Sequence, residues 1–261
     1  MLNMKNKEPN SPYLTLQTPE SALELRGVSY LYPSMSGHPP RGIHPCSLKL
    51  TRGQVYGLIG ANGAGKTTLF KLISGALTPQ IGQIYLSKRE VTHLPQWRRV
   101  RCGLGYLTQG DSLVSHMSVE WNLKIGLEAK KRWSQSTSSS IDHLTNTDHS
   151  TEGMKESISF ALAKVGLSQQ SRQSVMSLSG GERRRAEMAR LLVMRPQVIL
   201  LDEPFAAIDE AGLSMMMDII GLARAWGALV LLTDHQTQYV NDICQSLLIL
   251  DKGKLQRPQL S

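Results

Sequence analysis

The strongest chemical signal in the chain is a glycine-rich segment at residues 60–67, which reads Gly-Ala-Asn-Gly-Ala-Gly-Lys-Thr. This is a complete G-x-x-x-x-G-K-[ST] phosphate-binding loop. Its glycines allow a tight turn that directs backbone N–H groups at phosphate oxygens, Lys66 can reach the β- and γ-phosphates, and Thr67 can offer its hydroxyl to Mg²⁺. A glycine-rich turn without a ligand is the alternative, but the complete motif favours a nucleoside triphosphate.

The segments that flank this loop have the sequence patterns of a strand and a helix, the two elements that would hold it in place. Residues 54–59 form a short apolar run that predicts a strand, and residues 66–77 carry apolar side chains at helical spacing. The strand would lead into the loop, and the amino end of the helix would face the bound anion.

Two carboxylates follow another apolar run near the end of the chain. Residues 198–201 are Val-Ile-Leu-Leu, which predicts a buried strand, and Asp202 and Glu203 come directly after it. Asp202 is suited to bind Mg²⁺ from the side opposite Thr67, and Glu203 is suited to orient and polarise the attacking water. An ordinary strand exit would look the same in isolation, but it is a poor explanation beside a phosphate loop.

A second anion site is indicated by residues 178–182, Leu-Ser-Gly-Gly-Glu. Ser179 can cap the next helix, and Glu182, three residues later, completes a capping box. The glycines between them leave backbone N–H groups uncovered at a helix amino end. Because one loop already holds phosphates, we expect this tip to face the nucleotide of a second, similar chain; the alternative is a capped helix without a ligand.

Composition bounds the remaining possibilities. The chain has 261 residues, 41% of them hydrophobic, and no run approaches the roughly 20 apolar residues of a membrane span. Residues 1–20 lack the apolar core of a secretory signal. A charge of +8 favours an acidic partner only weakly, since each basic cluster is more typical of a solvated surface. Cys46, Cys102 and Cys244 have no metal-binding spacing, which indicates buried thiols in a reducing compartment.

Strand patterns alternate with helical patterns, which indicates βαβ units and a mostly parallel sheet. Several short helices are expected over residues 91–133, and the Ser- and Thr-rich segment 134–151 is expected to be a disordered insert or a long loop. The other expected elements are β-rich passages at 23–32 and 46–60 separated by a proline-rich loop, strands at 83–86, 198–201, 228–233 and 247–250, and helices ending at Gly166 and spanning 179–194 and 212–226.

Taken in order, these motifs resemble those of ABC-type ATPases over about residues 23–254, apart from the insert. The resemblance implies an α/β P-loop NTPase fold with a mostly parallel sheet core, an antiparallel β-rich N-terminal part and a helical signature subdomain. The expected organisation is a flexible tail at 1–20, an ABC ATPase domain at 21–254 and a short tail at 255–261. Within the domain, residues 46–108 and 195–254 would form a RecA-like core, and about 109–194 a helical subdomain.

The resemblance also supplies roles for single residues. Gln109 is similar to the Q-loop glutamine, which senses Mg²⁺ and water, Asp209 to the D-loop aspartate, and His235 to the switch histidine that contacts the γ-phosphate. Tyr32 is placed like the aromatic ring that stacks on adenine, with Tyr30 as the alternative. The predicted site is therefore catalytic Lys66, Gln109, Glu203 and His235; metal-binding Thr67, Gln109 and Asp202; and nucleotide-binding Tyr32, Gly60, Ala61, Asn62, Gly63, Ala64, Gly65, Lys66, Thr67, Thr68, Ser179, Gly180, Gly181, Glu182 and Asp209.

Such ATPases close head to tail around two ATP molecules with Mg²⁺ and deliver the motion to integral membrane permease subunits. Closer similarity points to ATPases of lipopolysaccharide exporters, at residues 94–99, 103–107, 181–185, 201–205 and 232–235. This implies a cytoplasmic protein, peripheral on the inner face of the inner membrane, with a second copy of itself as partner and no specific nucleic acid. The alternatives are an ATPase of branched-chain amino-acid importers and a soluble ABC ATPase of translation or DNA repair.

Four residues depart from the usual family pattern. Thr108 stands where proline is common, Glu210 also replaces a proline, and Val114-Ser115 takes the place of an aromatic-basic pair that lines the groove for the membrane partner. None of these residues carries the expected ATP chemistry.

Overall fold

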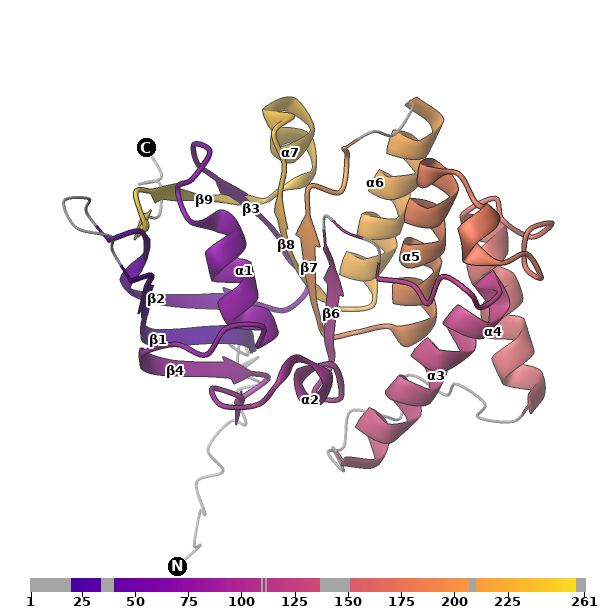
Figure 1. Ribbon diagram of the computed structural model, residues 1–261, viewed down its shortest axis with the longest axis horizontal. Helices are drawn as coiled ribbons and strands as arrows, with labels where there is room; N and C mark the ends of the chain where they lie inside the picture. Colours follow the sequence, from indigo (N-terminus) through magenta and orange to yellow (C-terminus); the bar gives the residue numbers. More distant parts are fainter. Residues whose placement is uncertain are drawn as a thin grey trace, which may run out of the picture.

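Six strands form the larger of two sheets, which lies at the centre of the molecule (Figure 1), and the apolar sequences of its inner strands β7 and β8 suit that buried position. They run in the order β10-β9-β3-β8-β7-β6, all parallel except β10, which pairs antiparallel with β9. Their bounds are β3 Val55–Ile59, β6 Leu104–Leu107, β7 Val198–Asp202, β8 Leu229–Thr233, β9 Ser246–Asp251 and β10 Lys254–Gln256. β7 and β8 are buried along their whole length, as parallel strands covered on both faces are.

This computed structural model describes residues 20–33, 40–108, 110, 112–136, 151–206 and 210–256, without the side chains of 130–136 and 151. A second sheet of four antiparallel strands has the order β2-β1-β4-β5. Its strands are β1 Ser21–Leu31, β2 Gly42–Thr51, β4 Ile81–Leu86 and β5 Arg89–Glu90. The expected α/β class, with a mostly parallel core and an antiparallel N-terminal part, is confirmed.

Helix α1 (Lys66–Ser74) lies between the two sheets (Figure 1). Its Leu69 and Phe70 belong to one buried cluster with Leu25 of β1 and Leu231 of β8. This packing fixes the helix whose amino end follows the phosphate loop.

The opposite face of the large sheet is covered by α5 (Gly180–Met194) and α6 (Glu210–Ala225) (Figure 1). Successive residues of a strand point to opposite faces. Leu200 of β7 accordingly belongs to the cluster around α1, whereas Ile199 and Leu201 belong to the cluster with α5 and α6. The remaining helices are α2 Gln96–Val100, α3 Val119–Ser136, α4 Thr151–Lys164, the 3-10 turn η2 Val175–Ser177 and α7 Thr237–Ile243.

Helices α3 and α4 pack against α5 on the side away from the antiparallel sheet (Figure 1). Within the part of the chain that the structure describes, no helix is both long and apolar enough to cross a membrane.

The prediction of several short helices over residues 91–133 is wrong. This stretch holds the five-residue α2, then strand β6, and then the 18-residue α3. Strand β6 escaped the sequence pattern because Gly105 interrupts its short apolar run. The glycine is required by packing: a Cβ there would come within 2.7 Å of both Leu191 and Pro196.

The prediction of a loop over residues 134–151 is wrong at both of its bounds. Residues 134–136 continue α3, and Thr151 begins α4. A helix runs on until a breaker ends it, and residues 134–136 contain neither Gly nor Pro. Residues 137–150 lie outside the described part of the chain.

The expected proline-rich loop also ends earlier, because β2 begins at Gly42 and contains Pro45. The pairing of β1 with β2 is irregular at this point, where the register shifts between Val28 and Tyr30. Proline has no N–H for a regular ladder, so it is tolerated at such an irregularity.

Candidate functional site

The phosphate loop connects β3 to α1 at the carboxyl edge of the large sheet. Gly65 is the N-cap residue of α1, with φ 110° and ψ 7°, and no side chain caps the helix. The positive φ by itself strains any residue with a side chain, and a Cβ here would also lie 3.1 Å from the Gly42 carbonyl oxygen, so this position requires glycine. The first turn of α1 contains no acidic residue. Its backbone N–H groups therefore suit an anionic ligand such as a phosphate.

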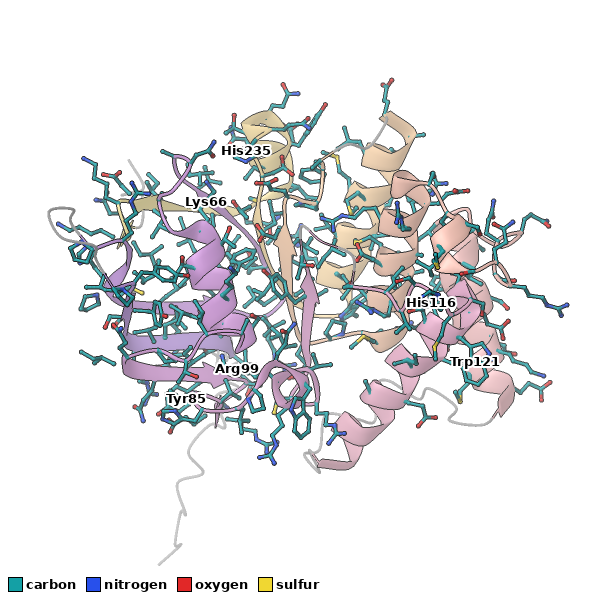
Figure 2. All side chains as sticks on the ribbon, in the orientation of Figure 1. Lys66, Tyr85, Arg99, His116, Trp121 and His235 are labelled. Carbon is teal, nitrogen blue, oxygen red and sulfur yellow. The ribbon has the colours of Figure 1, made fainter. Side chains whose placement is uncertain are left out.

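Lys66 lies over this loop. Its Nζ donates hydrogen bonds to the carbonyl oxygens of Gly60, at 2.6 Å, and Ala61, at 3.2 Å. The ammonium is held at the loop without a carboxylate partner among the described residues. β3 and β8 are adjacent parallel strands, so Lys66 and His235 follow strand ends on the same edge, as Figure 2 shows.

Asp202 ends β7 and is only 2% exposed. Its Oδ2 accepts a hydrogen bond from the Tyr106 hydroxyl at 3.4 Å. Burial, and secondly the charge of Glu203, raise the pKa of the Asp202 carboxyl above its usual value. The neighbouring β8 residue Thr233 has a buried hydroxyl without a hydrogen-bond partner among the described residues. A buried carboxylate beside an unpaired hydroxyl fits a polar ligand or a cation.

These oxygens are hard donors of the kind that Mg²⁺ prefers. Within the described ranges, no three His, Cys, Asp or Glu side chains form a cluster that could hold a metal ion by themselves. Sites with one or two carboxylates are typical where Mg²⁺ also binds the phosphates of a substrate. The Asp202 carboxylate, with the Thr233 hydroxyl on the neighbouring strand, therefore fits Mg²⁺ bound together with a nucleotide.

Glu203 and His235 are in direct contact. His235 Nε2 lies 2.7 Å from Glu203 Oε1, although the two residues are far apart in sequence. Glu203 has a φ of 51°, and its N–H donates to the Thr233 carbonyl at 2.7 Å. A non-glycine residue in the left-handed region is strained, and such residues gather at functional sites. The fold thus brings two of the predicted catalytic side chains together.

Sequence reasoning missed the role of Arg184, which it assigned with its neighbours to a solvated basic cluster. Its guanidinium is largely buried and donates to the backbone carbonyls of Thr108, Asp202 and Glu203. The available signal was Glu187, three residues later on the same helix face, with which Arg184 forms an ion pair at 3.2 Å.

The tip of α5 has the predicted capping box. Ser179 Oγ accepts a hydrogen bond from the Glu182 N–H, and the Glu182 carboxylate accepts from the Ser179 N–H at 2.8 Å. These bonds lower the pKa of the Glu182 carboxyl below its usual value. Cβ atoms added at Gly180 and Gly181 would meet nothing within 4 Å, so this turn is open.

Other predicted site residues are less constrained. The Tyr32 side chain is 37% exposed, and its ring packs edge-on against Tyr30 with centroids 5.0 Å apart. Its stacking on adenine stays a prediction. Gln109 and Asp209 lie outside the described residues.

Comparison with known proteins agrees with a nucleotide-binding site. The family model described as ABC transporter matches residues 43–206. The lipopolysaccharide export system ATP-binding protein LptB of Acidithiobacillus ferridurans is 38% identical, over 82% of this chain and 81% of its own length. The protein of the same name from Escherichia coli K12 is 36% identical, over 82% and 83%. A probable ABC transporter ATP-binding protein of Azorhizobium caulinodans is 34% identical, over 81% of this chain and 69% of its own length.

Solved structures with a similar fold are also ATP-binding cassettes. One is a dimeric post-hydrolysis cassette bound to ADP and Pi, with a TM-score of 0.74 and 19% identity, over 91% of this chain and 99% of that one. Another is a nucleotide-free cassette from an ABC transporter, with a TM-score of 0.71 and 22% identity, over 90% and 89%. At these identities the likeness shows the shared fold.

Proposed function

The chain belongs to the ABC transporter family of ATPases, and from that premise we propose that it powers the export of lipopolysaccharide from the inner membrane. The observation that carries the proposal is the 34–38% identity, over about 80% of the chain, to lipopolysaccharide-export ATPases of three different genera. The activity is ATP hydrolysis, and the coupling to this particular cargo is the proposed part.

In the proposed mechanism, ATP binds between residues 60–68 of one copy and residues 179–182 of a second copy. The open amino end of α1 and the uncovered turn at Gly180 and Gly181 support this arrangement, because each presents backbone donors to an anion. Tyr32 and Asp209 would complete the nucleotide contacts. Thr67, Asp202 and Gln109 would hold Mg²⁺, which neutralises charge on the phosphates when it is bound.

Glu203 and His235 have separate roles in this mechanism. Glu203 polarises the attacking water, and His235, whose ring contacts that carboxylate, binds the γ-phosphate. Lys66 leaves its loop carbonyls for the phosphates and offsets their charge. Hydrolysis removes the group that bridges the two copies, so the dimer opens.

The variant Glu203→Gln tests this assignment. It should bind ATP and accumulate as an ATP-bound dimer, while phosphate release falls by about 10²-fold or more, as expected for loss of a general base. Dimer formation is followed by light scattering on a sizing column. Glu156→Gln, an exposed change of the same type on α4, is the matched control. Parental hydrolysis by Glu203→Gln would contradict the mechanism.

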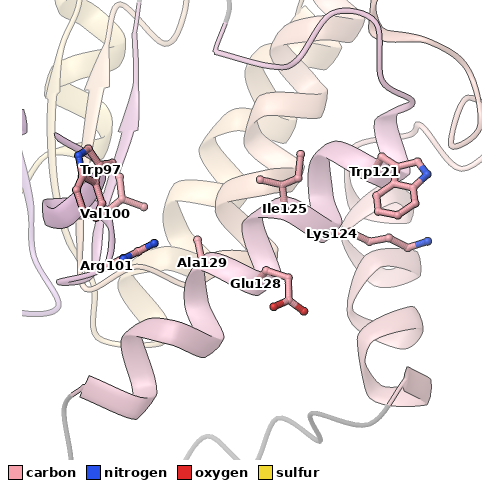
Figure 3. A pocket seen from close by; sticks show the side chains of 8 residues that line it. All are labelled: Trp97, Val100, Arg101, Trp121, Lys124, Ile125, Glu128 and Ala129. Atoms are coloured by element: carbon pink, nitrogen blue, oxygen red, sulfur yellow. The ribbon is translucent and has the colours of Figure 1, made fainter.

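A groove between α2 and α3 is the proposed docking surface for the membrane permease (Figure 3). It has a volume of about 480 Å³ and is lined by Trp97, Val100, Arg101, Trp121, Lys124, Ile125, Glu128 and Ala129. The side chains of Trp97 and Trp121 are 53% and 58% exposed. Large exposed indole rings are unusual on a surface that meets only water, and aromatic side chains dominate interface energetics.

Cations border the same groove. The Arg101 guanidinium lies 4.8 Å from the Trp97 ring centre, and the Lys124 ammonium lies 4.9 Å from that of Trp121. An apolar helix with acidic flanks fits such a surface. The double variant Trp97→Ala and Trp121→Ala should lose association with membrane subunits in detergent extracts but keep its own ATPase activity. Retained association would place the permease elsewhere.

The cargo is tested by depleting the protein in its own cells. Accumulation of lipopolysaccharide in the inner membrane supports export, whereas a selective loss of branched-chain amino-acid uptake supports the importer alternative. Co-fractionation with the inner membrane, and release from it by detergent, tests the proposed association with that membrane. The proposed division into a RecA-like core (46–108 and 195–254) and a helical subdomain (about 109–194) is tested by limited proteolysis.

A further inference from the structure

Arg184 joins three parts of the molecule that the reaction requires together. One nitrogen of its guanidinium, Nη1, donates to the Thr108 carbonyl at 2.7 Å and lies 3.2 Å from the Glu187 carboxylate. The other, Nη2, donates to the carbonyls of Asp202 and Glu203, each at 3.1 Å. The planar fork of arginine suits this arrangement because it directs several donors in fixed directions.

The two Nη2 bonds act where the backbone is strained. Glu203 has a φ of 51°, and its own N–H is held by the Thr233 carbonyl. Arg184 Nη2 holds the carbonyls of Asp202 and Glu203, so the peptide groups before and after the Glu203 Cα are both fixed. The direction of the Glu203 carboxylate, and hence its contact with His235, therefore depends on Arg184 as well as on β8.

Helix α5 also anchors the chain beyond Thr108. Glu187 accepts hydrogen bonds from the N–H and hydroxyl of Ser112, at 2.8 and 2.6 Å. Arg190 donates to the carbonyl and hydroxyl of the same serine, both at 2.6 Å. The segment that contains the predicted Q-loop glutamine is thus tied to α5 on each side.

We propose that Arg184 is a positioning residue that couples the orientation of the Glu203 carboxylate to helix α5. In the proposed dimer, the Ser179 tip of this helix contacts the ATP bound to the phosphate loop of the second copy. The Arg184 guanidinium therefore connects Glu203, which acts on the ATP of its own copy, to the helix that contacts the ATP of the partner. The inference rests on the proposed role of Glu203 in polarising water. Arg184 contacts neither the nucleotide nor the water in this proposal, and it acts on the reaction through the two peptide groups that flank Glu203, whose carbonyls Nη2 holds.

The variant Arg184→Lys tests the coupling. It keeps the positive charge beside Glu187 but loses the planar fork, so it cannot hold all four acceptors. We expect kcat for ATP to fall between about 10-fold and 100-fold, the range expected for a misplaced catalytic group, with KM within about twofold. ATP-dependent dimerisation should persist. Arg224→Lys, an exposed change on α6, should match the parent in all three measurements.

A double-mutant comparison separates positioning from general structural support. Because Arg184 acts through Glu203, Arg184→Lys should lower kcat in the parent but cause no further fall in the Glu203→Gln background. Thermal melting checks folding. If Arg184→Lys does not fold, the pair Arg184→Met with Glu187→Gln removes both buried charges and is measured in the same way.

The outcomes distinguish this inference from the proposed function. An Arg184→Lys variant as active as the parent, or one that loses dimerisation together with kcat, would overturn the coupling. A further fall in the Glu203→Gln background would also overturn it. Parental hydrolysis by Glu203→Gln alone would instead remove the proposed role of Glu203.

Discussion

Arg99 on α2 is the largest completely buried side chain among the residues that the structure describes, with 0% of its surface exposed. Its guanidinium donates to the carbonyls of Leu72 and Ile73 at the end of α1, at 2.6 and 2.8 Å. It also donates to the carbonyls of Thr92 and Leu94, each at 2.9 Å. We predict that Arg99→Met destabilises the protein by about 3 kcal/mol. The variant loses stability because it leaves buried carbonyls without a donor, and it regains part of that loss because it no longer buries a charge.

The magnitude follows from the acceptors that the variant leaves behind. The Leu72 carbonyl keeps the N–H of Gly75, at 3.3 Å, whereas the other three lose their described donor. A buried carbonyl without a partner costs about 2 kcal/mol, or about 6 kcal/mol for three. Burial lowers the pKa of Arg99 to about 10, so the variant recovers about 3 kcal/mol of charge burial. The difference is a net loss of about 3 kcal/mol.

Thermal unfolding measures this loss. For a chain of this length, 3 kcal/mol corresponds to a fall of about 6–12 °C in the melting temperature. The matched control is Arg98→Met, on the adjacent, exposed residue, whose guanidinium lies 5.0 Å from the Trp97 ring centre. This contact is worth about 0.5 kcal/mol. If the two variants melt within about 2 °C of each other, the buried hydrogen bonds do not have the assigned energy.

Three further predictions concern the thiols, the phosphate loop and the α5 tip. Burial raises the pKa of Cys46 to about 11 and that of Cys244 to about 12, so both thiols should resist iodoacetamide at pH 8 until the protein is unfolded. The stability that these raised pKa values contribute is present below about pH 8.5 and is lost as pH rises through the folded values. Gly65→Ala should lower the melting temperature and abolish stabilisation by ATP, because the φ of 110° strains a residue with a Cβ and that Cβ would lie 3.1 Å from the Gly42 carbonyl oxygen. Ser179→Ala should cost about 1 kcal/mol of stability and reduce hydrolysis, while ATP still binds to the phosphate loop.

The predictions for the phosphate loop and for the α5 tip each have a control within the chain. Gly221→Ala lies in the interior of α6, where a Cβ meets nothing, and should stabilise the protein by about 0.5–1 kcal/mol. Ser177→Ala, just before the tip, should hydrolyse ATP at the parental rate. Rapid alkylation of the folded protein would show that the thiols are accessible, and unchanged hydrolysis by Ser179→Ala would separate the α5 tip from the reaction.

Much of the fold could be predicted from local patterns. The strands around residues 198–202 and 229–233 are continuous apolar runs. Such runs can be recognised in the sequence because a parallel strand that is buried on both faces has apolar side chains at every position. The helix predicted over 212–226 spans Glu210–Ala225. The prediction failed at β6, where Gly105 breaks the apolar run, and at α3, where the polar residues 134–136 continue the helix.

The sequence by itself determined the ligand class and the family, because phosphate loops, strand-end acids and capping boxes are contiguous motifs whose geometry is local. Only the tertiary structure decided which distant groups meet. It joined Glu203 to His235 and turned two arginines of apparent surface clusters, Arg99 and Arg184, into buried donors to backbone carbonyls. Pairing across the fold depends on packing between elements, and the position of a charged residue in the sequence does not reveal which carbonyls will need its protons.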